Sequence, residues 1–302
     1  MQITSNLFSH NRFAFKTISY IWTHPNCQQH KFKSLLRFFS WQFYKRLTHR
    51  FLDFQLLPNI KLRCYPDSRS TAAVVYCGLY DYDDMNFLLR YLRTNDSFLD
   101  IGANVGVYTL LAASKIRAGY IYSFEALAKN YARLQENIRL NQFTQVKTYE
   151  IAVSNQTGTI ALNLAEGDSM PFITSTLTTN TITVATDTLD NLLQNQPITN
   201  LTLAKIDIEG AELLALEGAT SLLKQQSPRV WILEINETVH HFGHQKQDIV
   251  NFLHSYGYQL YSYSADTNQI SRITLEQKQG NNVLVIADSA LDFVRDRLAE
   301  IQ

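Results

Sequence analysis

The stretch that decides the fold is "FLDIGANVG", residues 98–106. An apolar run that contains the acid Asp100 is followed by Gly102, Asn104 and Gly106 at two-residue spacing. Glycine, and to a lesser degree asparagine, tolerates the left-handed backbone of a tight turn. The pattern therefore predicts a strand that turns sharply into a helix. Two interpretations stay open at this point: a simple corner in a sheet, or a turn whose backbone approaches a ligand.

Strand and helix patterns alternate on both sides of this turn. Helical patterns cover 106–118, 127–141, 211–225 and 248–258, and strand patterns cover 98–102, 119–125, 146–154, 201–210 and 229–236. Such alternation is typical of parallel strands joined by crossover helices. The segments 259–265 and 281–288 read instead as an antiparallel hairpin. We therefore predict an α/β fold with five parallel strands and a C-terminal antiparallel hairpin.

An excursion over residues 154–183 interrupts this alternation. Eight of the sixteen residues from Thr174 to Leu189 are threonine, and alternating threonine and apolar residues favour strands. We expect an edge hairpin here, with a substrate-contacting loop as the alternative.

The N-terminal part of the chain is basic and rich in aromatic residues. Ten Lys and Arg against one acid give residues 1–63 a net charge of +9, so the remainder of this neutral chain carries −9. A helix is predicted over 31–52, with Leu35, Leu36, Phe39, Phe43 and Leu47 near helical spacing. This segment could contact an anionic membrane surface or pack on the rest of the protein. A strand pair at 60–68 and 72–77 and a helix over 81–94 are expected to follow.

Composition excludes several classes of protein. The 302 residues, 45% of them hydrophobic, can bury a large core, and no run of 18 apolar residues predicts a membrane span. The N-terminus lacks the pattern of a secretory signal. The three cysteines, Cys27, Cys64 and Cys77, are scattered along the chain, which argues against disulfides and a zinc site. We therefore expect a cytoplasmic protein, located at the inner face of the membrane if the basic segment binds lipid.

Acidic residues near the turn favour one kind of ligand. Asp100 inside the turn would repel a pyrophosphate but suits an ammonium group, and the dinucleotide pattern G-x-G-x-x-G lacks its third glycine. Glu125 ends the second strand, where a carboxylate can accept hydrogen bonds from both hydroxyls of a ribose. Small Ala152, near the end of the third strand, would leave room for an adenine ring. Together these residues predict a site for S-adenosylmethionine.

Three separated runs carry a family resemblance: "YCGLYDYDDMNFLLRYLRTNDSFLDIGANVGVYTLLAA", "FEALAKNYARLQENIRLN" and "KIDIEGAELLALEGA". In this order they resemble the FkbM family of S-adenosylmethionine-dependent methyltransferases. The resemblance implies a Rossmann-like class I methyltransferase sheet of seven strands, S-adenosyl-L-methionine as cofactor, and O-methylation of a sugar or polyketide hydroxyl. It suggests an N-terminal segment over 1–69 and a methyltransferase domain over 70–302. Asp81 departs from the glutamate that relatives often carry.

The run "KIDIEGAE" supplies the candidate catalytic residues. Lys205, Asp207 and Glu209 alternate along a strand that should end beside the Gly-rich turn. Methyl transfer to an alcohol needs a base for the hydroxyl proton, so Asp207 or Glu209 is the candidate base and Lys205 its ion-pair partner. A purely structural ion-paired network at Gly210 is the alternative.

The sequence also leaves two other functional classes open. One alternative is a nicotinamide-dependent oxidoreductase or epimerase, but the chain lacks the third glycine of the dinucleotide pattern. The other is a nonenzymatic nucleotide- or membrane-binding protein, which would need only the basic segment and the turn. Nucleic acid is not expected as a partner; a small molecule or glycan with a free hydroxyl is. His240, His241 and His244 could suggest a metal, but Gly243 interrupts their helix, so no metal is predicted.

Overall fold

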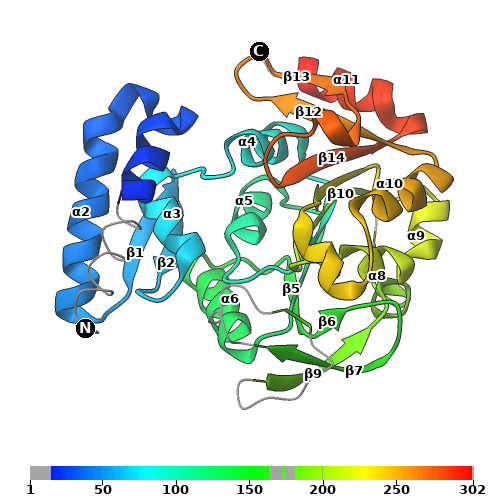
Figure 1. The fold of residues 1–302 in the computed structure, drawn as a ribbon, viewed down its shortest axis with the longest axis horizontal. Helices are drawn as coiled ribbons and strands as arrows, with labels where there is room; N and C mark the ends of the chain where they lie inside the picture. The colour runs from blue at the N-terminus through cyan, green and yellow to red at the C-terminus, as the bar shows by residue number, and fades with distance from the viewer. Residues whose placement is uncertain (1–14, 164–171, 174–180, 199, 301–302) are drawn as a thin grey trace. The chain divides into compact units, whose positions relative to one another are not determined.

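A computed structural model describes residues 15–163, 172–173, 181–198 and 200–300. The chain divides into two compact units, Met1–Tyr82 and Asp83–Gln302 (Figure 1). The boundary predicted from the sequence, between residues 69 and 70, lies within the first unit, at the start of one of its helices.

The N-terminal unit combines helices with one hairpin. Residues 15–23 are helical, and the 3-10 helix η1 (Pro25–His30), helix α2 (Lys31–Thr48), strands β1 (Leu52–Leu57) and β2 (Ile60–Cys64) and helix α3 (Arg69–Cys77) follow. α2 ends earlier than the predicted 31–52, because His49 takes a left-handed conformation and its N–H bonds the carbonyl of Lys45.

The strand predicted over 72–77 is wrong. These residues form α3, whose N-terminus is capped by the Ser68 hydroxyl accepting from the N–H of Thr71. β2 pairs instead with β1, through a turn in which Asn59 has φ +67°. The sequence "AAVVYC" mixes helix-favouring alanine with strand-favouring valine, so the cap and the competing β1 partner decided its structure.

An eight-stranded sheet forms the centre of the second unit, in the order β13-β12-β14-β11-β10-β3-β4-β5. Its strands are β3 (Ser97–Ile101), β4 (Ile121–Glu125), β5 (Val146–Glu150), β10 (Leu201–Ile206), β11 (Val230–Glu234), β12 (Tyr258–Ser264), β13 (Gln269–Arg272) and β14 (Asn282–Ala287). The five predicted parallel strands are confirmed, and β14 runs antiparallel to both β11 and β12 as expected. Edge strand β13 is an eighth strand that the prediction lacked. The fold is a Rossmann-like α/β fold.

Helices surround this sheet, as Figure 1 shows. They are α4 (Tyr82–Tyr91), α5 (Val107–Lys115), α6 (Ala128–Leu140), α7 (Leu189–Leu193), α8 (Glu212–Glu217), α9 (Thr220–Lys224), α10 (Lys246–Ser255) and α11 (Leu291–Ala299), with 3-10 helices η2 (Glu237–Phe242), η3 (Leu275–Gln277) and η4 (Asp288–Ala290). The single helix predicted over 211–225 is two helices, α8 and α9. The helix is interrupted at Gly218, where a Cβ atom would lie 2.1 Å from the carbonyl oxygen of Ser154. Buried strands such as β3, β10 and β11 form the core, because helices cover the sheet on both faces.

A second, smaller sheet takes up the excursion. The strand predicted over 146–154 splits at Ile151 into β5 and β6 (Ala152–Val153), and β6 joins β9 (Thr181–Asp187), β7 (Gly158–Asn163) and β8 (Phe172–Ile173) in the order β6-β9-β7-β8. β7 and β9 form the expected antiparallel pair, but in this separate sheet, drawn at the bottom of Figure 1, and not at the edge of the main one. Much of the threonine-rich run lies outside the described residues.

Candidate functional site

The predicted site residues come together at the carboxyl ends of neighbouring strands. β3 lies between β10 and β4 in the sheet, and the chain leaves β3 toward one side and β10 toward the other. In open α/β sheets, ligands bind in the crevice outside the strand ends at such a switch point. Asp100 and the following turn, Glu125, and the segment from Lys205 to Gly210 all come from these three strand ends.

The Gly-rich turn is packed tightly against the protein itself. Gly102, Asn104 and Gly106 all have positive φ angles, of 79°, 50° and 93°. A Cβ on Gly102 would lie 2.0 Å from the backbone oxygen of Asp207, and one on Gly106 would lie 2.6 Å from a methyl of Leu134. The close approach that the glycines permit is therefore to neighbouring protein atoms.

Glu125 is held rigidly at the end of β4. One carboxylate oxygen accepts the N–H of Asn104 and the other the N–H of Leu127, both at 2.8 Å. Burial raises its pKa to about 7, although these backbone donors act in the opposite direction. Each oxygen keeps a second lone pair, so the carboxylate can still accept hydrogen bonds from a ligand hydroxyl.

Asp100 is engaged more deeply than the sequence indicated. Its side chain is 1% exposed and accepts a hydrogen bond from the Thr109 hydroxyl at 2.5 Å, and Thr109 also lies 2.8 Å from the hydroxyl of Ser123. Lys205 occupies the register position opposite Asp100 on β10. Burial raises the pKa of Asp100, while the Lys205 ammonium acts to lower it. Asp100 is thus already engaged by its neighbours and would meet an ammonium group only by rearranging these contacts.

Ala152 lies beside the end of β4. The N–H of Ile151 donates to the Glu125 carbonyl at 3.1 Å, and Ala152 is half-buried at the start of β6. The residue that follows the Glu125 contact is therefore Ala152, and its place beside an adenine ring stays a prediction.

Lys205 and Asp207 form an ion pair at the end of β10. The ammonium nitrogen of Lys205 lies 2.7 Å from a carboxylate oxygen of Asp207 and 4.6 Å from the ring centroid of Tyr108. Lys205 is buried, whereas 35% of the Asp207 side chain is exposed. Burial raises the pKa of Asp207, but Lys205 outweighs this effect and brings the pKa below its usual value. Asp207 is therefore the ionised, partly exposed carboxylate of the crevice.

Glu209 does not continue the alternation predicted for it. β10 ends at Ile206, and Glu209 lies in the following turn with φ +56°. That turn is organised by buried Glu212, whose carboxylate accepts the N–H groups of Ile208 and Gly210, both at 3.1 Å. Burial raises the pKa of Glu212 to about 7.

Glu234, at the end of β11, lies near three other acids of the site, Asp207, Glu209 and Glu212. It is 7% exposed, and its Oε2 atom has no hydrogen-bond partner among the described residues. Burial and the nearby charges of Asp207, Glu209 and Glu212 raise its pKa to about 9. Burial and these charges therefore favour the protonated form of Glu234 at neutral pH.

Sequence reasoning missed Glu212, Glu234 and Thr109. A signal for Glu234 was available: "VWILE" ends a buried strand in an acid, as "IYSFE" does at Glu125. No comparable signal marks Thr109, which is an ordinary helix residue until the fold places it against Asp100.

Two histidine groups bear on metal binding. His24, Cys27 and Cys77 place potential ligand atoms within 4.8 Å of one another, the one such group in the described part of the chain. Two of the three cysteines, scattered in the sequence, therefore come together in the fold. Both ring nitrogens of His24 are already bonded, Nδ1 to the Asn26 N–H and Nε2 to the Tyr80 carbonyl. A metal would have to displace one of these bonds.

The second histidine group lies in and after η2. His240 bonds the carboxylate of Glu237 and the carbonyl of His244, at 2.9 and 3.0 Å, so its ring is held by its own segment.

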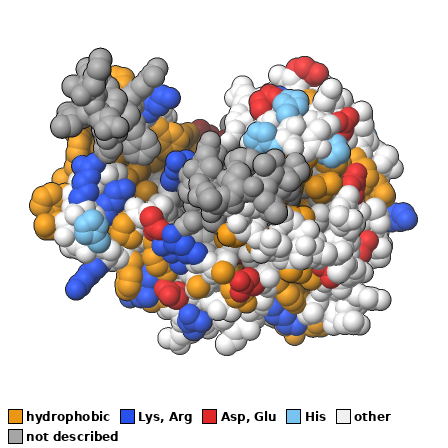
Figure 2. All heavy atoms as spheres, turned by 60° about the horizontal axis from the view of Figure 1, so that its bottom comes forward, with side chains coloured by type: hydrophobic (Ala, Val, Ile, Leu, Met, Phe, Trp, Pro, Cys, Tyr) orange, Lys and Arg blue, Asp and Glu red, His pale blue; other side chains and the backbone are white. Residues whose placement is uncertain are grey.

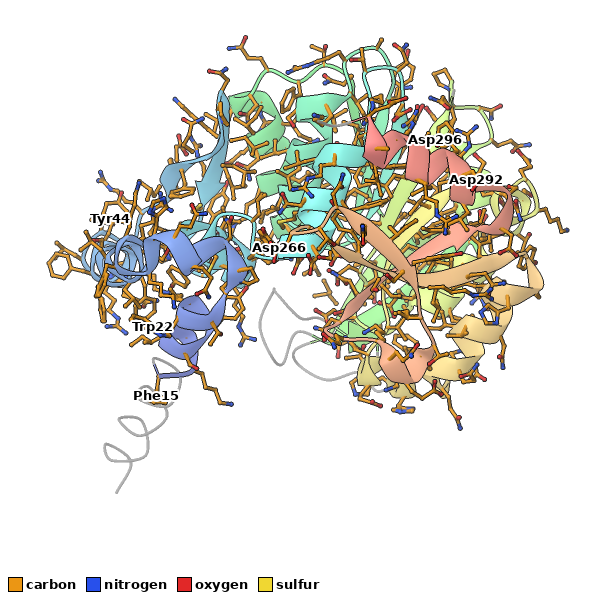
Figure 3. The ribbon with its side chains drawn as sticks, turned by 90° about the horizontal axis from the view of Figure 1, so that it is seen from above. Phe15, Trp22, Tyr44, Asp266, Asp292 and Asp296 are labelled. Carbon is orange, nitrogen blue, oxygen red and sulfur yellow. The ribbon has the colours of Figure 1, made fainter. Side chains whose placement is uncertain are left out.

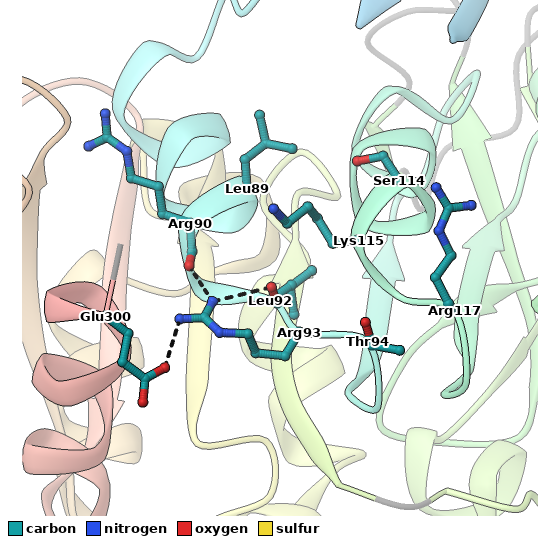
Figure 4. Close-up of a pocket in the computed structure, with 9 residues that line it drawn as sticks. All are labelled: Leu89, Arg90, Leu92, Arg93, Thr94, Ser114, Lys115, Arg117 and Glu300. Atoms are coloured by element: carbon teal, nitrogen blue, oxygen red, sulfur yellow. Dashed lines mark hydrogen bonds and ion pairs between the residues drawn. The ribbon is translucent and has the colours of Figure 1, made fainter. Parts of the chain in front are cut away.

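A separate hollow of about 590 Å³ lies near the amino ends of β3 and β4 (Figure 4). It is lined by Leu89, Arg90, Leu92, Arg93, Thr94, Ser114, Lys115, Arg117 and Glu300. Arg93 donates to the carbonyls of Arg90 and Arg297, and Arg90 donates to the carbonyl of Ala265. Two of its four bases thus serve the fold, and the crevice remains the better candidate site.

Comparison with known proteins identifies relatives. The family model described as "Methyltransferase FkbM domain" matches residues 100–260. Hexuronic acid methyltransferase AglP of Haloferax volcanii is 25% identical over 177 residues, which cover 57% of this chain and 67% of that protein. Methyltransferase 1 of Beauveria bassiana is 25% identical over 146 residues, or 41% of this chain and 59% of that protein.

Among solved structures, methyltransferase FkbM from Methylobacillus flagellatus is similar over 72% of this chain and 53% of its own, with 16% identity and a TM-score of 0.43.

Proposed function

The chain belongs to the FkbM methyltransferase family, and we propose that it transfers a methyl group from S-adenosyl-L-methionine to a hydroxyl of a sugar or glycan-type acceptor. The observation that carries this proposal is the crevice at the β3, β4 and β10 strand ends, which holds a rigid carboxylate, Glu125, and an ionised, partly exposed one, Asp207. Family membership sets aside the nicotinamide-dependent and nonenzymatic alternatives.

The crevice residues fit the proposed cofactor. Glu125 presents two oxygens with remaining lone pairs for the ribose hydroxyls, and Ala152 beside it leaves room for the adenine. Asp100 supplies a buried carboxyl group at the strand end that leads into the turn formed by Gly102, Asn104 and Gly106. Bound there, S-adenosyl-L-methionine supplies an electrophilic methyl group on a sulfonium.

Asp207 is the proposed base. An alcohol oxygen that forms a new bond to carbon must lose its proton, and a carboxylate within hydrogen-bond reach can accept it. Lys205 keeps Asp207 ionised and in place, at the cost of some basicity. Glu234, at the end of the neighbouring strand β11, also acts to lower the pKa of this carboxylate. Glu209, in the adjacent turn, is the alternative base.

A sugar acceptor is supported by the relative named a hexuronic acid methyltransferase. A hexuronic acid offers two kinds of oxygen, hydroxyls and a carboxylate. Methylation of a hydroxyl requires a base to accept its proton, whereas methylation of a carboxylate does not, because a carboxylate has no proton to lose at neutral pH.

The cofactor assignment predicts a specific loss of affinity. Glu125→Ala removes two charge-assisted hydrogen bonds to the ribose and the anchor of the Asn104 N–H, so we expect at least about tenfold weaker S-adenosylmethionine binding by calorimetry. Glu150→Ala is the matched control, since Glu150 is the exposed register neighbour of Glu125 on β5. Equal affinities in the two variants would remove the ribose assignment.

The base assignment predicts a loss of turnover without a loss of cofactor binding. With a panel of uronic acid and neutral glycans as acceptors, Asp207→Asn should lower kcat by about 10²–10⁴-fold. Glu209→Gln should lower it less, and Asp292→Asn on α11 (labelled in Figure 3) should not change it.

The product separates two outcomes. An alkali-stable methyl ether, detected by mass spectrometry, supports the hydroxyl acceptor. An alkali-labile methyl ester together with full activity of Asp207→Asn would show a carboxylate acceptor that needs no base, and would refute this role of Asp207.

A further inference from the structure

Helix α2 presents an unusual outer face. Phe32, Leu36, Phe39, Phe43 and Leu47 are between 56% and 80% exposed, and we call these five residues the outer stripe. Their spacing of four, three, four and four residues places them on one side of the helix. Four of them, together with Leu35, are the apolar residues that predicted this helix from the sequence, and the helix packs through its other side.

The buried side of α2 lies directly opposite. Ser34, Phe38 and Trp41 are the buried residues of this helix, and Phe38 contacts Tyr76 of α3 with 5.1 Å between ring centroids. At 100° per residue, the outer stripe covers an arc of about 80° and runs for about 22 Å along the helix. A continuous exposed apolar surface of this kind marks an interaction site.

The charges around the outer stripe have one sign. α2 contains five basic residues and no acid: Lys31, Lys33, Arg37, Lys45 and Arg46. Exposed Lys33 and Arg46 flank the stripe on its two sides, and exposed Arg50 follows the helix. Figure 2 shows apolar and basic side chains mixed on the surface of the N-terminal unit. The partner of this surface must be both apolar and anionic.

Trp22 extends the apolar surface at the start of α2. Its ring packs edge-on against Phe32 at 6.1 Å, and the Lys31 ammonium lies 5.0 Å from the same ring. Figure 3 shows Trp22 on the chain segment that follows exposed Phe15. Tryptophan beside lysine is typical of segments at the boundary between lipid headgroups and acyl chains.

We propose that the outer stripe lies in the interfacial layer of an anionic lipid bilayer, with α2 parallel to the membrane plane. A helix in this position buries its apolar face about 5–10 Å into the headgroup boundary while its flanking bases meet anionic lipids. A second copy of the chain is a poorer partner. A symmetric dimer through the same face would bring Lys33 and Arg46 toward identical bases with no acid on α2 to offset them. No helix in the described part of the chain is long and apolar enough to cross a bilayer.

The full-length protein offers a built-in probe for this contact. Of its three tryptophans, Trp22 is 44% exposed, while Trp41 and Trp231 are buried. Phosphatidylcholine vesicles with about one third phosphatidylglycerol should pellet the protein at low salt and shift its tryptophan emission to shorter wavelength. High salt and pure phosphatidylcholine should both weaken the binding, because the anionic attraction is screened or absent. Trp22→Phe should lose the emission shift while keeping most of the pelleting.

Variants locate the contact on the outer stripe. Phe39→Ser with Phe43→Ser should lower the vesicle partition coefficient by at least about tenfold, since both rings leave the lipid. Lys33→Glu with Arg46→Glu should lower it by about tenfold or more on anionic vesicles. The control is Lys115→Glu with Arg117→Glu, which changes the net charge by the same amount at two exposed bases of the other unit. This control should leave the vesicle partition coefficient unchanged.

Two results would overturn the proposal. One is no pelleting on anionic vesicles at low salt. The other is a concentration-dependent dimer in sedimentation velocity that Phe39→Ser with Phe43→Ser converts to monomer, because the stripe would then be covered by a second copy. Neither result bears on methyl transfer, which is measured separately.

Discussion

Two glycines with similar backbones have different surroundings. Gly102 has φ +79° and Gly243 has φ +75°, so both occupy the region that other residues enter only at a cost. A Cβ on Gly102 would meet the Asp207 backbone, whereas a Cβ on Gly243 would find no atom within 4 Å. A substitution of Gly102 would therefore cost free energy twice, once for the left-handed backbone and once for the clash of the new Cβ with Asp207. Asp207 is also the proposed base.

This difference predicts unequal losses of stability. Gly102→Ala should lower the free energy of unfolding by about 3 kcal/mol or more, because the turn must move away from Asp207. Gly243→Ala should cost only about 1–2 kcal/mol, the conformational part alone. Urea denaturation of both variants measures the two values, and equal losses would contradict the contact at Gly102.

Helix α2 illustrates how one element can have two apolar faces with different tasks. Phe38 and Phe39 are neighbours in sequence and their rings are in contact, with centroids 5.1 Å apart. Phe38 is 3% exposed and belongs to the core of the N-terminal unit, while Phe39 belongs to the outer stripe. Stability and partner binding should therefore separate along this helix.

Alanine at each position tests that separation. Phe38→Ala should lower the free energy of unfolding by about 3–5 kcal/mol, as large core truncations do. Phe39→Ala should change it by no more than about 0.5 kcal/mol, because the ring is largely in water already. Thermal unfolding followed by circular dichroism compares them; a large loss for Phe39→Ala would mean that the stripe is packed within the chain.

The stability of the second unit should depend on pH through its buried acids. Glu125, Glu212 and Glu234 all have raised pKa values, about 7, 7 and 9. A carboxyl that keeps its proton in the folded state and loses it in the unfolded state favours unfolding as the pH rises. For Glu234 this window runs from its ordinary pKa of about 4.5 to about 9. The folded protein should therefore lose stability from mildly acidic to mildly basic pH.

Glu234→Gln should remove its share of that loss. The amide has nearly the same size as the carboxyl group but carries no titratable proton. The gain in unfolding free energy over the parent should be small at pH 5 and larger at pH 8, rising by at most about 1.4 kcal/mol per pH unit. Glu150→Gln, at an exposed position, is the control. A pH-independent difference between Glu234→Gln and the parent would contradict a protonated Glu234.

Local patterns were sufficient for all strands of the main sheet except β13, and they brought the candidate site residues to one end of that sheet. Apolar runs bounded by turn residues identified the five parallel strands, and the final hairpin differed enough in its pattern to be recognised as antiparallel. Asp100, Glu125 and Asp207 could be selected because acids at strand ends meet at one edge of a parallel sheet. These features depend on residues close in sequence and on the fixed geometry of parallel strands.

Long-range contacts decided the rest. Whether "AAVVYC" became helix or strand depended on β1 competing for β2, and which apolar face of α2 was buried depended on α3. The raised pKa of Glu234 and the lowered pKa of Asp207 both arise because β11 lies beside β10, which brings two acids 27 positions apart close to each other. Burial, pKa and ion pairing depend on neighbours in space, and these exist only once the chain has folded.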